Sequence, residues 1–184
     1  GRPCGMDDIM GIARKHTLHI VEDCAHAIET EYHGKKAGTF GDFGCFSFYV
    51  TKNLTTGEGG MVVANDDRRA DMIKVLALHG MNKDAWRRFS DDGYKHYEVV
   101  YAGFKYNMTD LQAALALHQL PRIDRSWERR RELWKRYDAA FAGLRCITPA
   151  PEDPNTRHGY HLYTPLVDIT RAGRTRDEVL TELT

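Results

Sequence analysis

The sequence predicts an α/β fold with a mostly parallel sheet. Short apolar runs alternate with segments in which apolar residues recur at helical spacing, and this alternation is typical of sheets covered by helices. Residues that form turns and caps, mainly Gly, Asn and Asp, separate the two kinds of segment. The chain has 184 residues, of which 42% are apolar, so it is long enough for one medium domain or for one and a half small ones.

The first 78 residues contain the clearest elements. Met6, Ile9, Met10 and Ala13 repeat with a helical period, and Asn65-Asp66-Asp67 provides the turn and N-cap of a later helix. The expected helices cover residues 6–15 and 68–78, the expected strands cover residues 18–21, 45–50 and 60–64, and the Gly-rich, charged residues 33–44 are expected to form a loop.

The rest of the chain begins with an irregular, aromatic-rich stretch at residues 79–107. Thr109-Asp110-Leu111-Gln112 has the sequence of a capping box and starts an Ala-rich helix that reaches Leu120. Pro121 then opens a long charged helix to about Ala142. The remaining expectations are a linker-like stretch at 149–155, a strand at 161–168 and a helix from residue 174 onward.

The change in composition at Pro121 indicates a domain boundary. Residues 1–118 are expected to belong to a large domain, and residues 119–184 are expected to begin a smaller one. The chain starts at Gly1 and stops inside a helical pattern without a stop signal, so we expect a fragment of a longer protein. No signal peptide is visible.

Charge and cysteine content narrow the function classes. Twenty-six basic residues balance 26 acidic ones, so no net field draws the chain to nucleic acid or to an anionic membrane. No apolar run approaches the roughly 20 residues of a transmembrane helix. The four cysteines lie far apart in the sequence without a Cys-x-x-Cys pair, and reduced thiols in a cytoplasmic protein fit them better than disulfides.

An acid and a lysine at the ends of neighbouring expected strands are the main candidates for a functional site. Asp23 ends one expected strand, Lys52 follows the next, and the Gly-rich run from Thr55 to Gly60 comes after it. Open α/β sheets bind ligands at the carboxyl ends of their strands. Pyridoxal phosphate needs a lysine amine for its aldehyde carbon and a carboxylate for its ring nitrogen, so the pair suits this cofactor. A simple strand-end cap for Asp23 and a solvated surface charge for Lys52 are the alternatives at this point.

Other motifs have plainer interpretations. His16-x-x-His19 and His158-x-x-His161 have metal-ligand spacing, but no Cys or carboxylate completes either set, so no metal is expected. Gly38-x-x-Gly41 is not a phosphate loop, and it is expected to turn tightly and let the backbone pass close to a cofactor. Arg129-Arg130-Arg131 is expected to be the solvated face of an amphipathic helix. Trp86-Arg87-Arg88-Phe89 suits an anionic nucleotide-sugar about as well as it suits a loop that packs its own aromatic rings.

Several motifs occur in a fixed order along the chain. They are Glu22-Asp23-Cys24-Ala25-His26-Ala27, Gly38-Thr39-Phe40-Gly41-Asp42, Phe46-Ser47-Phe48-Tyr49-Val50-Thr51-Lys52-Asn53, Gly57-Glu58-Gly59-Gly60, Leu78-His79-Gly80-Met81, Gly103-Phe104-Lys105-Tyr106-Asn107-Met108-Thr109-Asp110 and Gln112-Ala113-Ala114. In order and spacing, these motifs closely resemble the DegT/DnrJ/EryC1/StrS family of sugar aminotransferases. The resemblance covers nearly the whole chain.

The resemblance implies a fold and a set of site roles. The fold is the aspartate-aminotransferase type, fold type I of the pyridoxal-phosphate enzymes, with a large, mostly parallel sheet domain and part of a small α+β domain. Lys52 is implied to bond to the aldehyde carbon of the cofactor, and Asp23 is implied to pair with its ring nitrogen. His26 would lie by the ring, where many relatives have Gln, and Ser47 would donate to the phosphate. Asn107 would reach the phosphate site of a neighbouring subunit.

The resemblance also implies a reaction. An amino group would pass from an amino acid, glutamate, to the keto carbon of a nucleotide-linked sugar, and the 103–110 stretch looks most like members that aminate the sugar C4 position. Relatives that work as dehydratases replace the lysine with histidine, so Lys52 favours transamination. A sugar dehydratase or isomerase, or a non-catalytic truncated module, are the alternatives.

Family membership further implies a cytoplasmic homodimer that serves the biosynthesis of cell-surface polysaccharides. Family members have an N-terminal segment that supplies further phosphate donors, and they have a longer small domain. We therefore expect the 184 residues alone to express poorly and to bind the cofactor weakly.

Overall fold

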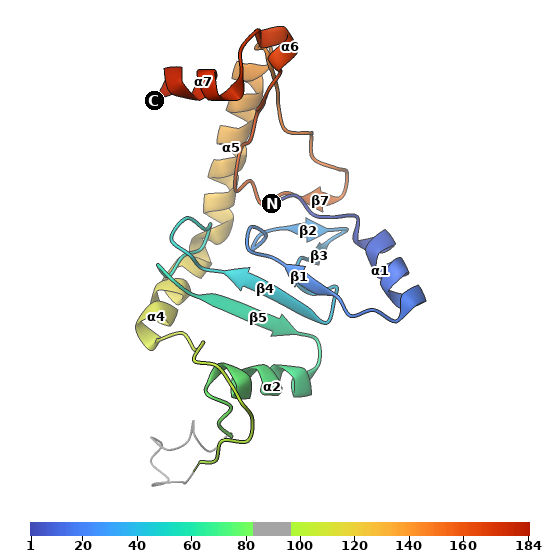
Figure 1. Ribbon diagram of the computed structural model, residues 1–184, viewed down its shortest axis with the longest axis vertical. Helices are drawn as coiled ribbons and strands as arrows, with labels where there is room; N and C mark the ends of the chain where they lie inside the picture. The colour runs from blue at the N-terminus through green and yellow to red at the C-terminus, as the bar shows by residue number, and fades with distance from the viewer. Residues whose placement is uncertain (83–96) are drawn as a thin grey trace.

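The computed structural model describes residues 1–82 and 97–184 (Figure 1). Its central sheet has the strand order β1-β4-β5, formed by Val21–Asp23, Phe43–Ser47 and Gly60–Ala64. β1 and β4 are parallel, whereas β4 and β5 are antiparallel. The β4–β5 connection contains no helix, and a parallel neighbour needs a crossover connection that is usually helical. The part of the sheet in this chain is therefore mixed.

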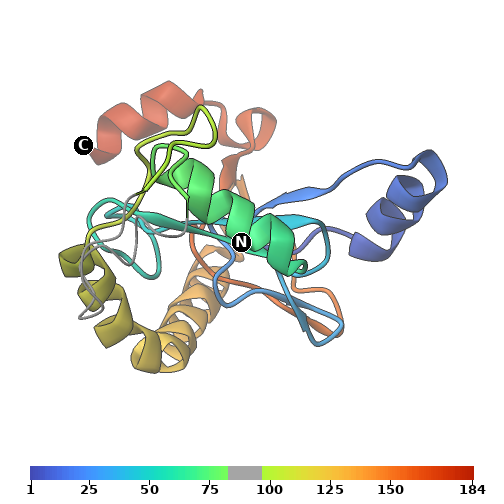
Figure 2. The ribbon, with the colours of Figure 1, turned by 90° about the horizontal axis from the view of Figure 1, so that it is seen from below.

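The helices before and after this sheet lie where the sequence predicts them. α1 covers Met6–His16 and ends at Thr17, whose φ of 53° is left-handed. α2 covers Asp67–Ala77, and the side chain of Asp66 accepts a hydrogen bond from the Arg69 backbone N–H at 3.0 Å. Seen from below, α1 lies on the opposite side of the molecule from α4 and α5 (Figure 2).

The first two strands of the central sheet differ from the prediction. The strand expected at residues 18–21 begins only at Val21. The Ile20 N–H is taken up by the side chain of Asp42, to whose Oδ2 it donates, while the Ile20 C=O accepts from the N–H groups of Asp42 and Phe43. β4 ends at Ser47, three residues before the predicted end, because Phe48 already donates to Gly59 O across the following loop. β5 agrees with the prediction.

A second, small sheet has the order β3-β2-β7. β2 covers Glu31–Tyr32, β3 covers Lys35–Lys36, and β7 covers Thr156–Arg157. The β2–β3 hairpin turns at His33 and Gly34, which both have positive φ, the conformation that suits a two-residue hairpin. The expectation of a loop over residues 33–44 is wrong at 35–36, since two-residue strands are too short to show alternation, and again at the start of β4.

The second half of the chain is built on a long helix. α4 covers Asp110–Gln119 and begins with the predicted capping box at Thr109. A 3-10 turn at Leu120–Arg122 holds Pro121, and α5 covers Ile123–Phe141. α5 leads from the sheet to the far end of the molecule, where α6, Ile169–Ala172, and α7, Arg176–Leu183, lie (Figure 1).

The strand predicted at residues 161–168 is only partly present. It is reduced to β8, Leu166–Val167, which pairs with β6, Cys146–Ile147. The residues before β8 instead pack side chains against the rest of the molecule, and Tyr160 has a positive φ that a strand would not allow. The division into residues 1–118 and 119–184 stays a prediction.

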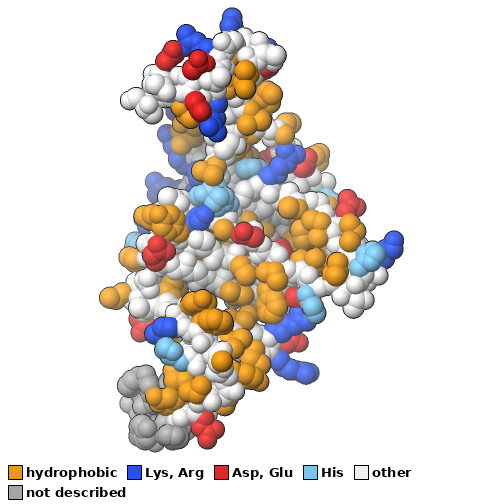
Figure 3. All heavy atoms as spheres, viewed as in Figure 1, with side chains coloured by type: hydrophobic (Ala, Val, Ile, Leu, Met, Phe, Trp, Pro, Cys, Tyr) orange, Lys and Arg blue, Asp and Glu red, His pale blue; other side chains and the backbone are white. Residues whose placement is uncertain are grey.

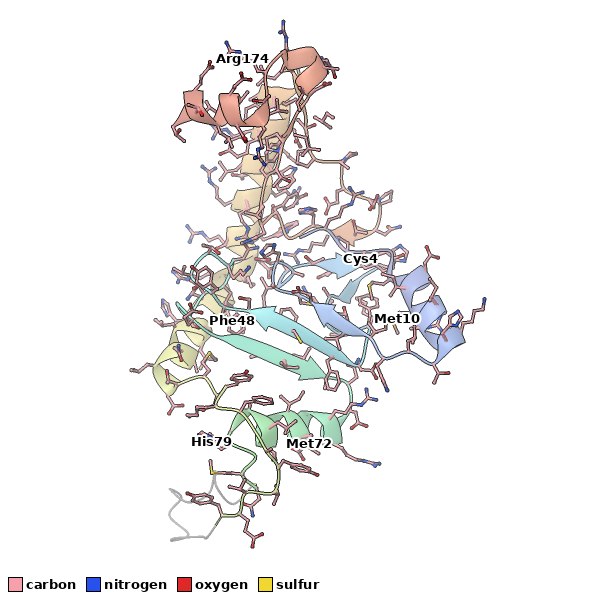
Figure 4. All side chains as sticks on the ribbon, in the orientation of Figure 1. Cys4, Met10, Phe48, Met72, His79 and Arg174 are labelled. Carbon is pink, nitrogen blue, oxygen red and sulfur yellow. The ribbon has the colours of Figure 1, made fainter. Side chains whose placement is uncertain are left out.

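Trp127 of α5 anchors the segment around residue 160. Its Nε1 donates to His158 O at 2.7 Å, and the guanidinium of Arg157 lies 4.1 Å from its ring centre. Phe48 is buried just after β4 ends (Figure 4). This packing brings residues from both halves of the chain to the end of β4. No helix in the described residues is long and apolar enough to cross a bilayer.

Candidate active site

Lys52 lies in the loop that returns from β4 to β5. Its backbone N–H donates to Tyr49 O at 2.9 Å, and Phe48 closes the base of the loop through bonds to Gly59 O and from the Thr56 N–H. A side chain at Gly59 would meet Thr56 Oγ1 at 2.4 Å, so the Gly-rich run is required for the close packing of this loop. The loop therefore presents Lys52 from a fixed base.

The amine of Lys52 is paired with an imidazole. Lys52 Nζ lies 2.7 Å from His26 Nε2. Burial, and then the positive charge of Lys52, lower the pKa of His26, so the ring is neutral and can accept a hydrogen bond from the lysine. Both side chains line a small cavity with Ser47. The structure thus brings together Lys52, His26 and Ser47, three of the residues singled out by the sequence.

Asp23 lies at the end of β1 beside this cavity. In the parallel ladder it pairs with Cys45, which is two residues before Ser47 on β4. Since paired residues share a face and side chains alternate along a strand, Asp23 is on the same face of the sheet as Ser47. Asp23 Oδ1 accepts the Ala25 N–H at 3.0 Å, and Oδ2 has no hydrogen bond within the described residues.

The neighbouring carboxylate, Glu22, has a different task. Its two oxygens accept three backbone N–H groups, from Gly38, Phe40 and Gly41, each at 2.7 Å. The Gly38-x-x-Gly41 turn was expected to bring the backbone close to a cofactor. In the structure its backbone N–H groups instead bind the carboxylate of Glu22. Of the two adjacent acids, Asp23 is the one left with a free oxygen for a ligand.

Asn107 lies apart from the other sequence-predicted residues. It is not among the described residues that line the Lys52 cavity. Its Oδ1 accepts a hydrogen bond from the ammonium of Lys105. The adjacent Tyr106 is 76% exposed. A role for Asn107 at the Lys52 site of the same chain is therefore not supported by the geometry.

A polar network behind the cavity was not foreseen from the sequence. The ring of His161 lies 4.0 Å from that of His26, centre to centre, and its Nδ1 is 2.8 Å from Asn53 Oδ1. Asn53 Nδ2 donates to Glu29 Oε2 at 2.9 Å and to Gly159 O at 3.0 Å. Asn53 follows Lys52 directly, and His161 stood out in the sequence only through the His158-x-x-His161 spacing. Nothing in the sequence pattern pointed to Glu29 or to the contact of His161 with His26.

The network ends in an ion pair. Glu29, whose side chain is 1% exposed, pairs with Arg130 of α5. The Arg129-Arg130-Arg131 run was expected to be a solvated face, and this holds for Arg129 and Arg131, which pair with Glu132 and Glu128 on the helix surface. It is wrong for Arg130, because a buried carboxylate needs a charged partner.

Among the described residues, the two histidine pairs and Cys24 form no separate site. His161 turns toward His26, whereas His158 packs against Trp134, and the described residues contain no group of three His, Cys, Asp or Glu side chains that could hold a metal. Trp86-Arg87-Arg88-Phe89 lies outside the described residues. Cys24 lines the Lys52 cavity, but burial raises its pKa to about 12, so its thiol is not a nucleophile.

The donor set fits an aldehyde cofactor with a basic ring nitrogen and a phosphate. The cavity offers an amine at Lys52 with a neutral acceptor beside it, and a hydroxyl at Ser47. A carboxylate with a free oxygen lies on the same sheet face. These are the groups that pyridoxal phosphate requires of a protein.

Comparison with known proteins agrees with this chemistry. The chain is 50% identical over 184 residues to the spore coat polysaccharide biosynthesis protein SpsC of Bacillus subtilis. The match covers 100% of this chain and 47% of SpsC. The chain therefore spans about half the length of the curated relatives that it matches.

Solved structures give the same result. The PLP form of the putative sugar aminotransferase Spr1654 from Streptococcus pneumoniae has a TM-score of 0.85 and 30% identity, over 98% of this chain and 49% of that one. DesI, crystallised in the presence of its TDP-sugar product, has a TM-score of 0.83 and 29% identity, over 100% of this chain and 44% of that one. These neighbours confirm the predicted aspartate-aminotransferase type of fold.

The DegT/DnrJ/EryC1/StrS aminotransferase family model matches residues 1–184, so the match includes every motif on which the resemblance was based. The chain belongs to the DegT/DnrJ/EryC1/StrS aminotransferase family.

Proposed function

We propose that the protein is a pyridoxal-phosphate-dependent aminotransferase. It moves an amino group from an amino acid, glutamate, to the keto carbon of a nucleotide-linked sugar, at C4. The observation that carries this proposal is the pairing of the Lys52 amine with a neutral His26, 2.7 Å away, beside a strand end that holds the carboxylate of Asp23. The PLP form of Spr1654 supports the cofactor, and the TDP-sugar product of DesI supports the substrate class.

Each site residue has a role in this reaction. When bound, pyridoxal phosphate supplies an electron sink for the charge left when the amino acid loses its α-proton. Asp23 holds the ring nitrogen protonated; an ion pair at about 4 Å is worth roughly 4 kcal/mol at an effective dielectric of 20, or about 3 pKa units. Ser47 donates its hydroxyl proton to the phosphate.

Lys52 has two tasks. It holds the cofactor covalently at rest, and as a free amine its Nζ takes up the α-proton of the amino acid and delivers it again. A neutral His26 accepts a hydrogen bond from Nζ and thereby keeps the amine aimed into the cavity. A lysine that stands alone in a solvated loop would have no such fixed direction, and this direction is what supports transamination over a structural role.

We infer that the intact protein is a cytoplasmic homodimer, with residues 1–118 in its large domain and residues 119–184 at the start of the small one. Apolar side chains near Asn107 are strongly exposed: Tyr106 by 76%, Leu111 by 83% and Leu117 by 70%. Hydrophobic side chains also gather over the sheet and α2 (Figure 3). Surfaces of this kind are typical of interfaces. A second subunit packed there would receive Asn107 at its own phosphate site.

The experiment that tests the function is Lys52→Ala in the full-length protein. The variant should lose the visible absorbance of lysine-bound cofactor, and its transfer of nitrogen from glutamate to a nucleotide keto-sugar should fall by at least about 10³-fold, because both the covalent link and the proton carrier are gone. Lys15→Ala, at an exposed position near the end of α1, is the matched control and should behave like the wild type.

Two outcomes would overturn the proposal. One is Lys52→Ala with wild-type activity. The other is a wild-type protein that consumes the keto-sugar without any amino donor, because a dehydratase or isomerase needs none.

A further inference from the structure

The network behind the Lys52–His26 pair has no role in the reaction described above. It runs from Glu29 through Asn53 to His161, and its members come from three separate stretches of the chain. Glu29 is buried, and Asn53 and His161 are half-buried. Polar groups that are hydrogen-bonded to one another away from water favour one arrangement of side chains, because an alternative leaves donors or acceptors unpaired. The arrangement fixed here lies directly against the site.

The hydrogen-bonding chemistry determines which atoms carry the protons. Glu29 is paired with Arg130 and is therefore ionised, so it can only accept. Both contacts of Asn53 Nδ2 are to acceptors, Glu29 Oε2 and Gly159 O, which identifies this atom as the amide nitrogen. Asn53 Oδ1 then faces His161 Nδ1 at 2.8 Å, and because an amide oxygen only accepts, His161 must carry its proton on Nδ1.

His161 is held in the neutral form by its surroundings. Burial, and then the electrostatic influence of the neighbouring His26 ring and of the positively charged Lys52, lower the pKa of His161 to about 4. A neutral ring with its proton on Nδ1 places no charge beside His26. The ring itself lies 4.0 Å from that of His26, tilted by 39°, and occupies the space into which His26 would otherwise turn.

We propose that His161 is a positioning residue: fixed by Asn53 and Glu29, its ring holds His26 in place as the neutral acceptor that aims the Lys52 amine. The inference rests on the proposed function, since Lys52 must be the reactive lysine for the aim to matter. His161, late in the chain, would then control the geometry around Lys52 after the end of β4. Transfer activity would depend on the contact between the His161 and His26 rings.

The first test measures the protons directly and needs no cofactor. In the full-length protein without cofactor, labelled with ¹⁵N at histidine, the ring of His161 should show a protonated Nδ1 and an unprotonated Nε2 at pH 7. In Asn53→Leu that preference should be lost, because Nδ1 has no acceptor. A wild-type His161 protonated on Nε2, or on both nitrogens, would overturn the proposal, and this result is independent of whether the protein is an aminotransferase.

The second test separates positioning from mere stability in the cofactor-loaded protein. His161→Leu should lower kcat by about ten-fold while KM for the amino donor changes by less than about two-fold, and the pH dependence of the cofactor absorbance should shift. His161→Gln, whose amide can still donate to Asn53, should recover part of the loss. His16→Gln, at an exposed position at the end of α1, is the control, and it should leave kcat and the pH dependence unchanged.

A double variant completes the experiment. If Asn53 acts through His161, then Asn53→Leu combined with His161→Leu should be little worse than either change alone. Additive losses, or a His161→Leu protein with the kcat and pH dependence of the wild type, would overturn the proposal. Should the leucine variants not fold, His161→Gln and the wild-type histidine spectrum still decide it.

Discussion

The residues around Lys52 and the C-terminal helices are held in opposite ways. At the Lys52 cavity, the hydrogen bond from His161 to Asn53 spans 108 residues and the pair of Arg130 with Glu29 spans 101. At the C-terminus, the capping box of Thr175 with Glu178 spans three residues, and the pair of Arg174 with Glu182 spans eight. The first region is half-buried, with Glu29 fully buried, and is assembled from distant segments. The second is exposed and is assembled from residues near one another in the sequence (Figure 4).

The contrast teaches where a substitution will matter. Removing one residue of a buried ion pair leaves the other charge without water or a counter-ion, which costs stability. In an exposed ion pair, water solvates the remaining charge and almost no stability is lost. We therefore expect large and far-reaching effects from changes near Lys52, and small and local effects from changes in residues 168–184.

After Lys52→Ala, the largest effect is expected from Asp23→Asn. The amide keeps the shape but removes the charge that holds the cofactor ring nitrogen protonated, so kcat should fall by up to about 10³-fold, equivalent to roughly 4 kcal/mol. The visible absorbance of bound cofactor should persist, since Lys52 is intact. Steady-state kinetics and an absorption spectrum of the full-length protein check both points.

Glu22→Gln is the informative partner of that variant. The carboxylate of Glu22 accepts three backbone N–H groups. Glu22→Gln should therefore lower the free energy of unfolding far more than Asp23→Asn does. If Asp23→Asn leaves kcat unchanged, Asp23 is only the cap of Ala25 and its placement at the cofactor ring is wrong.

A smaller effect, on stability, is expected from Arg130→Met. The side chain of Glu29 is only 1% exposed, and this substitution removes its counter-charge. The free energy of unfolding should therefore fall by about 3 kcal/mol. Arg129→Met on the same helix removes a surface pair in which both side chains are more than half exposed, and should cost less than about 1 kcal/mol. Urea unfolding of both variants measures the difference. Equal losses of unfolding free energy in Arg130→Met and Arg129→Met would show that the buried ion pair contributes no more to stability than the exposed one.

The smallest effect is expected from Thr175→Ala. Thr175 accepts from the Glu178 N–H and begins α7, so its loss should destabilise that helix by about 1 kcal/mol. Hydrogen exchange over residues 176–183 should become faster, and kcat should stay within two-fold of the wild type. A larger loss of activity would mean that α7 is coupled to the Lys52 site, and the two regions would then not be independent.

Local signals in the sequence located most elements, and the family resemblance singled out three residues, Lys52, His26 and Ser47, that line one cavity. The helical period of residues 6–16 and the caps at Asp66 and Thr109 each depend on neighbours within four residues, so they can be recognised without the fold. Strand ends were less secure: the start of β1 depends on Asp42, which bonds to Ile20 from 22 residues away.

The sequence by itself predicted an α/β chain with a lysine and a hydroxyl at the end of one strand, and with a carboxylate and a histidine at the end of its neighbour. Only the tertiary structure decided which of two adjacent acids is free, which of three arginines turns inward, and that His161 meets His26. The physical reason is the range of the interactions. Periodicity and caps act within a few residues, whereas the partner of a buried polar group is chosen by whichever distant segment the packing brings within about 3 Å.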